Sequence, residues 1–169
     1  MRVTNIHKRK LPQSLIKVSP LLHTLGTGND AIWPNENWPS IYFKEGLKKG
    51  SPGGHGIIKY TIADYDKAGN IIFNFTKPKG FEGIHQFKLE ATSENETLIT
   101  HDIQMHTTTI KSTWFWIVAI RWLHDALIEE AFDKMESQFS EVKIKPKYTL
   151  WVKFLRCLFK RKALKLKYV

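Results

Sequence analysis

The chain has 169 residues, of which 42% are hydrophobic and 12% aromatic, enough for one packed domain and too few for two comfortable ones. Its single cysteine, Cys157, excludes an internal disulfide and any cysteine-based metal cluster, which fits a reducing compartment. The net charge of +10 arises entirely in residues 142–169, which carry ten basic and no acidic side chains, so the neutral body of the chain gives no indication of nucleic-acid binding.

The first third of the chain predicts short elements. Residues 2–10 are typical of a polar first strand, and residues 14–25 have the apolar spacing of a helix that Pro20 should bend or split. Two Trp-Pro pairs in residues 33–39 favour extended backbone before a short strand that ends at Phe43. The glycines of residues 50–56 predict a loop or bulge.

From residue 58 onward the hydrophobic period changes to two. Apolar side chains alternate with polar ones in residues 58–62, 71–75, 81–89 and 99–105, which predicts four successive strands. Each strand has one apolar face, and together they predict an antiparallel sheet that needs a cover on that face.

The predicted cover is a helix over residues 113–139, which would be about 40 Å long at 1.5 Å per residue. Arg121 and Asp125 lie on its polar side, four residues apart, and should form an ion pair across one turn. Glu129 and Glu136 share this polar side. The apolar stripe that would face the sheet consists of Trp116, Ile120, Leu123, Leu127 and Ala131.

This element order is that of the helix-grip fold, an α+β fold in which a curved antiparallel sheet wraps around a long C-terminal helix. Four sequence blocks also resemble those of bacterial proteins in the SRPBCC superfamily, whose members are START-like and polyketide-cyclase-like: WPNENWP at residues 33–39, GGHGIIKYTI at 53–62, FEGIHQF at 81–87 and RWLHDALIEEAFD at 121–133. The resemblance covers residues 1–139 and implies an apolar cavity between sheet and helix that holds lipids, sterols or polyketides in relatives. We therefore expect a helix-grip domain over residues 1–141 and a basic tail over 142–169.

The main functional hypothesis is binding of a lipid-like or aromatic small molecule in that cavity, without a cofactor. Inward-facing and aromatic side chains are predicted to contact the ligand: Tyr60, Phe73, Phe75, His85, Phe87, His101, Ile103, Met105, Trp116, Ile120, Leu123, His124 and Leu127.

An enzymatic alternative is a cyclase or dehydratase in which His85, His101 or Glu130 acts as general acid or base. Pairing that keeps the apolar faces together is expected to set Leu89 opposite His101, which separates the two histidines by about 13 Å. No metal site is therefore predicted for them. Glu130, nearly inside the apolar stripe, is expected either to have a raised pKa or to have a structural role. In the structural role it reaches a partner such as His124, Arg121 or a strand side chain, or lies past the sheet edge.

The tail predicts an amphipathic basic helix after Pro146. It can contact a membrane surface, dock on the domain or a partner, or, less favourably, meet nucleic acid. The residues assigned to membrane contact are Trp151, Lys153, Phe154, Arg156, Lys160 and Arg161. Residues 1–11 lack the apolar core of a signal peptide, and the longest apolar run, 114–120, is too short to span a bilayer. We expect a cytoplasmic protein that can bind peripherally to the inner face of the membrane; its oligomeric state is left open.

Overall fold

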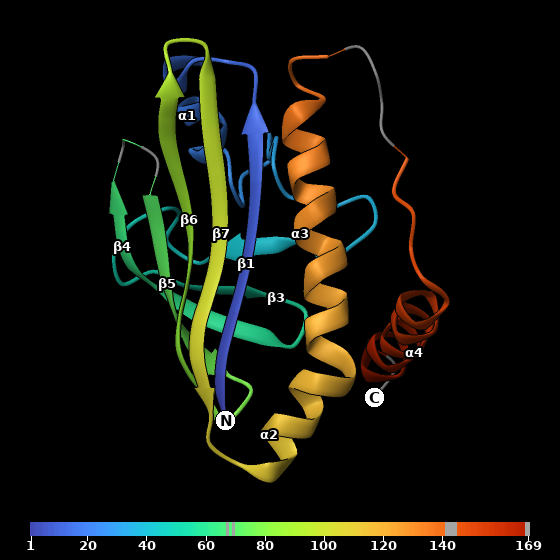
Figure 1. Ribbon diagram of the computed structural model, residues 1–169. Coiled ribbons are helices and arrows are strands. Elements are labelled where there is room, and N and C mark those ends of the chain that lie inside the picture. Colours follow the sequence, from blue (N-terminus) through green and yellow to red (C-terminus); the bar gives the residue numbers. More distant parts are fainter. Residues whose placement is uncertain (67, 69, 141–144, 168–169) are drawn as a thin grey trace.

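The computed structural model describes residues 1–66, 68, 70–140 and 145–167, with side chains up to residue 160. Seven strands form one antiparallel sheet in the order β1-β7-β6-β5-β4-β3-β2 (Figure 1). The elements in chain order are β1 (Arg2–Leu11), α1 (Leu15–Leu22), β2 (Ile41–Phe43), β3 (Pro52–His55), β4 (Ile58–Asp66), β5 (Asn70–Lys77), β6 (Phe81–Ser93), β7 (Glu96–Thr107), α2 (Ile110–Phe115), the π-helical turn η1 (Trp116–Ile120), α3 (Arg121–Glu136) and α4 (Leu150–Lys167).

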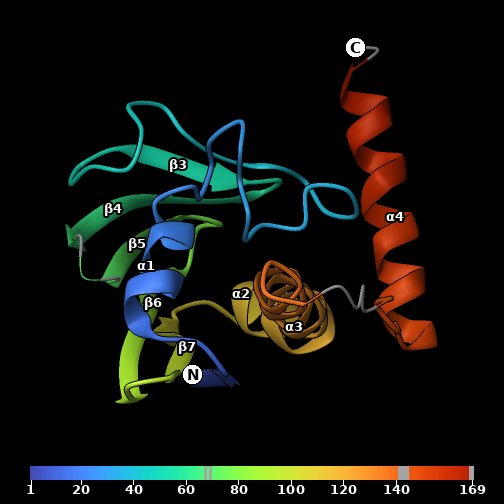
Figure 2. The ribbon, with the colours of Figure 1, turned by 90° about the horizontal axis from the view of Figure 1, so that it is seen from above.

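The sheet curves around the long helix. Seen from above in Figure 2, the strands follow an arc from β3 to β7, and α3 lies inside that arc. The helix α1 closes part of the same side of the sheet, while α4 lies on the opposite side of α3. This arrangement is the predicted helix-grip fold, and all four strands that the two-residue period indicated are present.

One local prediction in the first third was wrong. The glycine-rich stretch forms a strand, β3, because Gly53 allows the chain to approach β2 closely: a Cβ there would lie 2.4 Å from the carbonyl oxygen of Tyr42. Pro20 does not split α1, because the helix runs through it and ends at Leu22.

The long helix is continuous from Ile110 to Glu136, but its turns are not uniform. Thr109 and Ser112 form a capping box at the start, each side chain bonding the other's backbone N–H. The segment Trp116–Ile120 is then a single π-helical turn, with α-helix on both sides. The predicted stripe meets the sheet, although Leu123 is only partly buried.

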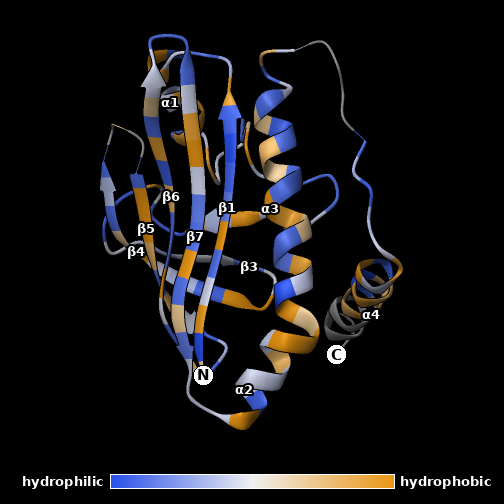
Figure 3. Cartoon of the chain, viewed as in Figure 1, coloured by the Kyte–Doolittle hydropathy of each residue, from blue (hydrophilic) through white to orange (hydrophobic). Residues whose placement is uncertain are grey.

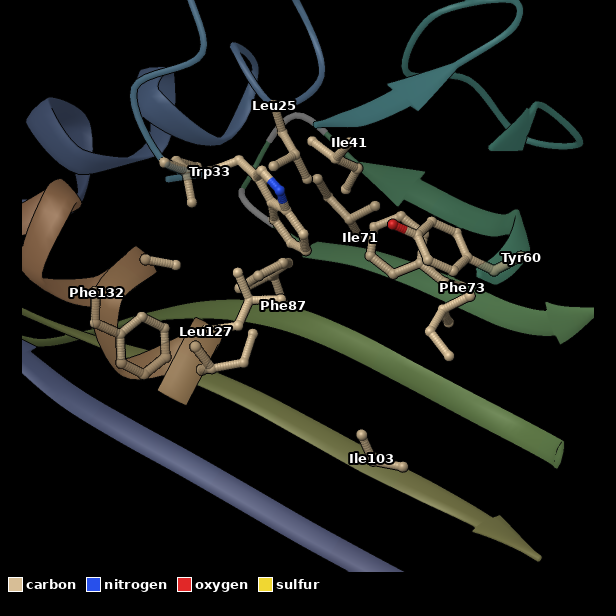
Figure 4. Packing of buried hydrophobic residues seen from close by; sticks show 14 of the residues in the cluster. Leu25, Trp33, Ile41, Tyr60, Ile71, Phe73, Phe87, Ile103, Leu127 and Phe132 are labelled. Atoms are coloured by element: carbon tan, nitrogen blue, oxygen red, sulfur yellow. The ribbon is translucent and has the colours of Figure 1, made fainter. Parts of the chain in front are cut away.

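One contiguous core fills the concave side of the sheet. In Figure 4, Leu127 and Phe132 of α3 point toward Phe87 and Trp33, and Tyr60 lies beside Phe73. Phe73, Phe132 and Ile71 are fully buried, and Tyr60 and Phe87 retain only 1% exposure. Packing of sheet, helix and the loop before β2 therefore leaves little open space in this part of the interior.

The acidic side of α3 faces the edge strand β1, which is largely hydrophilic in Figure 3. The predicted pair between Arg121 and Asp125 is not what the structure shows: Asp125 accepts a hydrogen bond from Asn5 of β1, at 2.9 Å, and the Arg121 guanidinium lies over the ring of Trp122. One turn further along α3, Glu129 binds Arg9 at 3.0 Å. A polar seam thus joins the helix to the sheet edge.

The tail helix α4 docks on the domain. Val152 and Leu155 are buried, the indole nitrogen of Trp151 donates to the carbonyl oxygen of Val118 at 3.0 Å, and Arg156 lies between two aromatic rings. The expected boundary between residues 141 and 142 lies outside the described residues, as does the side chain of Arg161. Among the described residues, no helix is long and apolar enough to cross a membrane.

Candidate functional site

The pairing of β6 with β7 brings two histidines together, contrary to the predicted register. Phe87 lies opposite His101 and His85 opposite Ile103, so the histidines are diagonal neighbours rather than four residues apart. Their ring nitrogens, Nδ1 of His85 and Nε2 of His101, are 3.4 Å apart. A shift of two residues preserves both faces of a strand, so the apolar pattern could not select the register.

Two further polar side chains complete a cluster that we call the histidine site: Tyr60, His85, His101 and His124. Tyr60 comes from β4 and His124 from α3, so three elements of the sheet and the covering helix each contribute. The ring centroids of Tyr60 and His85 are 4.7 Å apart, and those of His101 and His124 are 5.0 Å apart. The site therefore lies between the concave face of the sheet and the long helix.

Buried polar atoms in this site lack partners. The Tyr60 hydroxyl, Nε2 of His85, Nδ1 of His101 and both ring nitrogens of His124 have no hydrogen-bond partner among the described residues. Each unsatisfied buried group costs about 1–3 kcal/mol, and most buried polar groups in native proteins are paired. Five such atoms are therefore concentrated in this one site among the described residues.

Electrostatics keep the imidazoles of the site neutral. Burial, reinforced by the neighbouring histidines, holds the pKa of His85 and that of His101 well below the ordinary value. Burial also lowers the pKa of His124, and the proximity of Asp125 only partly opposes it. Burial raises the pKa of Tyr60 well above 10, so its phenol stays protonated and can donate.

Neutrality gives the histidine pair a fixed hydrogen-bonding capacity. A neutral imidazole has one N–H donor and one bare nitrogen acceptor. Whichever ring donates across the 3.4 Å contact, the two outer nitrogens, Nε2 of His85 and Nδ1 of His101, are then one donor and one acceptor. The pair can satisfy a hydroxyl or carboxylic acid group, and reversal of both tautomers would move a proton between its two ends.

The predicted contact residues fall into two sets. Some lie in the core at 4% exposure or less: Tyr60, Phe73, Phe87, His101, Ile103, Met105, Trp116 and Leu127. Others retain exposed surface: Phe75, Leu123 and His124 are partly buried, and His85 and Ile120 are each 8% exposed. The rings of Phe75 and His85 are 4.7 Å apart, so this less closed part of the interior adjoins the histidine site near η1.

Glu130 does not belong to the histidine site. Its carboxylate accepts hydrogen bonds from the side chains of Asn37, at 2.5 Å, Trp38, at 2.6 Å, and Tyr148. These partners come from the loop before β2 and from the segment before α4, and they differ from the expected His124 and Arg121. Glu130 is thus a structural anchor, and of the three predicted acid-base residues only His85 and His101 converge.

Two histidines near the site were missed. His55 lies in the stretch that was predicted as a loop, and its ring is 4.7 Å from that of Trp33 and 6.1 Å from that of Tyr60. His7 lies on β1, where it shares the inward face with Asn5 and Arg9. Their alternation along residues 5–9 was the available signal, although polar residues on an inward face do not by themselves indicate a site.

Comparison with known proteins identifies the fold. No family model and no curated protein sequence matches the chain. Among solved structures, CalU16 from Micromonospora echinospora superposes with a TM-score of 0.59 and 10% identity, covering 95% of this chain and 88% of that one. Norcoclaurine synthase from Thalictrum flavum, in complex with dopamine and hydroxybenzaldehyde, superposes with a TM-score of 0.61 and 12% identity, covering 85% of this chain and 91% of that one. A protein from Thermobifida fusca superposes with a TM-score of 0.62 and 7% identity, covering 86% of this chain and 99% of that one.

The class that fold and site define is therefore a helix-grip protein with a polar, histidine-rich site under its long helix. The sequence identities of 7–12% establish the shared fold and no more.

Proposed function

We propose that the chain is a member of the SRPBCC superfamily that binds a small, largely apolar molecule carrying a hydroxyl, carbonyl or carboxyl group. The molecule lies between the sheet and the long helix and hydrogen-bonds the histidine site. The observation that carries this proposal is the set of buried polar atoms on Tyr60, His85, His101 and His124 that lack partners among the described residues.

Recognition combines an apolar part and a polar part. Aromatic rings lie beside the histidines: the ring centroids of Phe75 and His85 are 4.7 Å apart, and those of Phe87 and His101 are 4.6 Å apart. Each hydrogen bond that the ligand makes to a buried neutral group contributes about 1 kcal/mol, and each 25 Å² of apolar area buried adds about 0.6 kcal/mol. A bare hydrocarbon of the same shape would leave the site's polar atoms unpaired and should bind more weakly.

The part of the interior near η1 is the place for the apolar body of the ligand. Phe73 and Phe87 are already packed, so a long lipid chain has no room beside them. Phe75 and Leu123 are only partly buried where they pack against the core, and His124 of the histidine site is partly buried as well. This arrangement supports a compact aromatic ligand over the long-chain lipid that the superfamily resemblance also allows.

The test compares phenol with toluene, which differ by a hydroxyl in place of a methyl group. We expect phenol to shift the ring signals of His85 and His101 in NMR titrations and to bind about tenfold more tightly than toluene, a difference of about 1.4 kcal/mol. Hydroxybenzaldehyde and a long-chain fatty acid extend the series, and native mass spectrometry of the purified chain looks for a co-purified molecule.

Matched variants locate the site. His85→Phe and His101→Leu should abolish the preference for phenol, whereas His106→Leu, which changes an exposed histidine at the end of β7, should leave it intact. Absence of any co-purified or added ligand, or a phenol preference that persists in both inner variants, contradicts the proposal.

A second candidate function is contact of the outer helices with an anionic membrane surface. Large apolar side chains are exposed on neighbouring helices, including Trp114 at 63% and Phe154 at 55%. Exposed Lys153 and Lys160 lie on α4 among them. The remaining exposed side chains of this kind on the outer helices are Ile110, Ile117, Val118, Trp122, Leu150, Trp151 and Leu158. Exposed apolar side chains on helices that also carry exposed basic groups fit an interfacial membrane site.

Docking of α4 changes which tail residues can serve this function. Arg156 is engaged between aromatic rings, and the indole of Trp151 bonds Val118, so both hold the tail to the domain. Phe154→Ser combined with Trp114→Ser should abolish co-sedimentation with vesicles of phosphatidylcholine and phosphatidylserine. Tyr42→Ser, at an exposed aromatic residue of β2, is the control. Equal sedimentation of all three proteins, or none by the wild type, would contradict membrane contact.

A further inference from the structure

The polar seam between β1 and α3 contains a cluster of metal-ligating groups that adjoins the histidine site and shares His124 with it. His7 lies on β1, and His124 and Asp125 lie on α3, with one ligating atom of each within 4.8 Å of the others. His7 and His124 are each 12% exposed at the side chain, whereas Asp125 is 37% exposed. The cluster is thus largely buried on the histidine side and open to solvent on the carboxylate side.

The distances suit a shared ion. Nε2 of His7 is 3.2 Å from Oδ1 of Asp125, and Nδ1 of His124 is 3.6 Å from the same oxygen. In a tetrahedral zinc site with bonds of about 2.0–2.1 Å, neighbouring ligand atoms lie about 3.3 Å apart. These two separations bracket that value, and the third, between the ligating nitrogens of the two histidines, is no more than 4.8 Å.

Groups around the cluster hold its ligands in the orientation that metal binding needs. Nδ1 of His7 lies 2.7 Å from Oε1 of Glu129, so a neutral His7 that donates there leaves Nε2 bare toward Asp125. The amide of Asn5 donates to Oδ1 of Asp125 at 2.9 Å. Arg9 in turn fixes the other oxygen of Glu129 at 3.0 Å.

An ion pair alone explains only part of this arrangement. A protonated His7 between Asp125 and Glu129 would account for those three side chains, which meet at hydrogen-bond distance. His124 would still be left with both ring nitrogens buried and without a hydrogen-bond partner among the described residues. A neutral imidazole nitrogen facing a carboxylate at 3.6 Å is a poor hydrogen-bond contact and a suitable metal-ligand neighbour.

We propose that His7, His124 and Asp125 form a binding site for a single Zn²⁺ ion or a similar borderline divalent metal, with Glu129 and Asn5 as its positioning residues. Two imidazoles and one carboxylate favour zinc, cobalt or nickel over the oxygen-seeking Mg²⁺ and Ca²⁺. Three protein ligands leave the fourth tetrahedral position for water or another ligand. The metal site shares His124 with the histidine site, and the zinc and phenol titrations test the two proposals separately.

The test is calorimetric titration of the full chain with zinc chloride, with native mass spectrometry to count bound ions. We expect one ion per chain, no comparable binding of Mg²⁺, and shifts of the His7 and His124 ring signals in NMR. Asp125→Asn and His7→Gln keep the side-chain size and should weaken zinc binding by at least about 100-fold. Glu129→Gln, which weakens the contact that positions His7 and also the pair with Arg9, should weaken zinc binding by about tenfold.

The control is Asp133→Asn, which removes another carboxylate of the same seam that contacts Arg9 but lies outside the cluster. It should bind zinc as the wild type does. Thermal unfolding of each variant confirms that it is folded. No stoichiometric zinc binding by the wild type, zinc binding that the His7 and Asp125 variants retain, or equal binding of Mg²⁺ would overturn the proposal.

Discussion

The indole nitrogen of Trp38 donates a hydrogen bond of 2.6 Å to the carboxylate of Glu130, which lies 92 residues later in the chain. The same carboxylate also accepts from Asn37 and Tyr148. Glu130 is only 7% exposed, so this single side chain joins the loop before β2, the long helix and the segment that leads to α4.

Removal of that acceptor should be costly. Glu130→Ala leaves the buried indole of Trp38, the partly buried hydroxyl of Tyr148 and the amide of the exposed Asn37 without their acceptor. We expect the free energy of unfolding to fall by about 3 kcal/mol in urea denaturation. Glu90→Ala removes an exposed glutamate that pairs with Lys88 and should change the free energy by less than about 0.5 kcal/mol. A loss below about 1 kcal/mol for the Glu130 variant would contradict its role as an anchor.

Attachment of α4 should depend on Arg156. Its guanidinium lies 4.7 Å from the ring centroid of Trp38 and 4.1 Å from that of Tyr148, and it donates to the carbonyl oxygen of Asn37. Arg156→Lys keeps the charge and loses the planar stacking, so amide exchange in α4 should accelerate about fivefold, equivalent to about 1 kcal/mol. Lys153→Ala, at an exposed position of the same helix, should leave the exchange rates unchanged; equal rates in all three proteins would refute this attachment.

Gly83 should not tolerate a side chain. Its φ of +145° is one that other residues rarely adopt, and a Cβ there would lie 2.3 Å from the carbonyl oxygen of Gln104 in β7. Gly83→Ala should lower the free energy of unfolding by about 2 kcal/mol or more. Gly28→Ala provides a matched control, because nothing lies within 4 Å of a Cβ there. Similar stabilities of the two variants would show that β6 and β7 are not so closely apposed.

Stability should fall in acid because of inner histidines. Burial, with the proximity of His124 and Lys59, lowers the pKa of His55 to about 3, and burial holds the pKa of His85 well below 6.5. Below pH 6.5 the unfolded chain binds protons at these groups while the folded chain does not. As the pH falls from the pKa of the unfolded chain to that of the folded chain, each of these histidines therefore lowers the free energy of unfolding by about 1.4 kcal/mol per pH unit.

Unfolding free energies measured from pH 7 to pH 4 check this expectation. His55→Phe and His85→Phe should each reduce the loss of unfolding free energy on acidification by about 1.4 kcal/mol per pH unit. Slopes that match the wild type in both variants would mean that these imidazoles are protonated in the folded chain.

Local patterns predicted most of the fold. The two-residue alternation found the strands β4 to β7, and the helical period found the long helix and, in the tail, α4. These features depend on near neighbours in the chain. The strand β3 was missed because Gly53 and Gly54 indicate a loop unless the close approach of β2 is known.

The site was harder to predict because it depends on pairing over long sequence distances. His85 and His101 were correctly predicted to face inward. Their separation depends on the register between β6 and β7, and a shift of two residues in that register leaves the alternation of apolar and polar side chains unchanged. The turn that sets Ser93 opposite Glu96 determines which register forms. Asp125 and Glu129 were predicted to lie on the polar side of the helix, which is usually exposed to solvent. Their partners on β1 lie about 120 residues earlier, with no local signal to connect them.

The π-helical turn has a consequence for how this chain can vary. Two successive carbonyl oxygens within it receive indole N–H groups, that of Ile117 from Trp122 and that of Val118 from Trp151 of α4. Backbone atoms make these contacts, so exchanging the side chains at positions 117 and 118 leaves them in place. Losing one residue from the turn would instead rotate everything beyond it by about 100°. The number of residues between Trp116 and Arg121, more than their identity, is the quantity that selection must preserve.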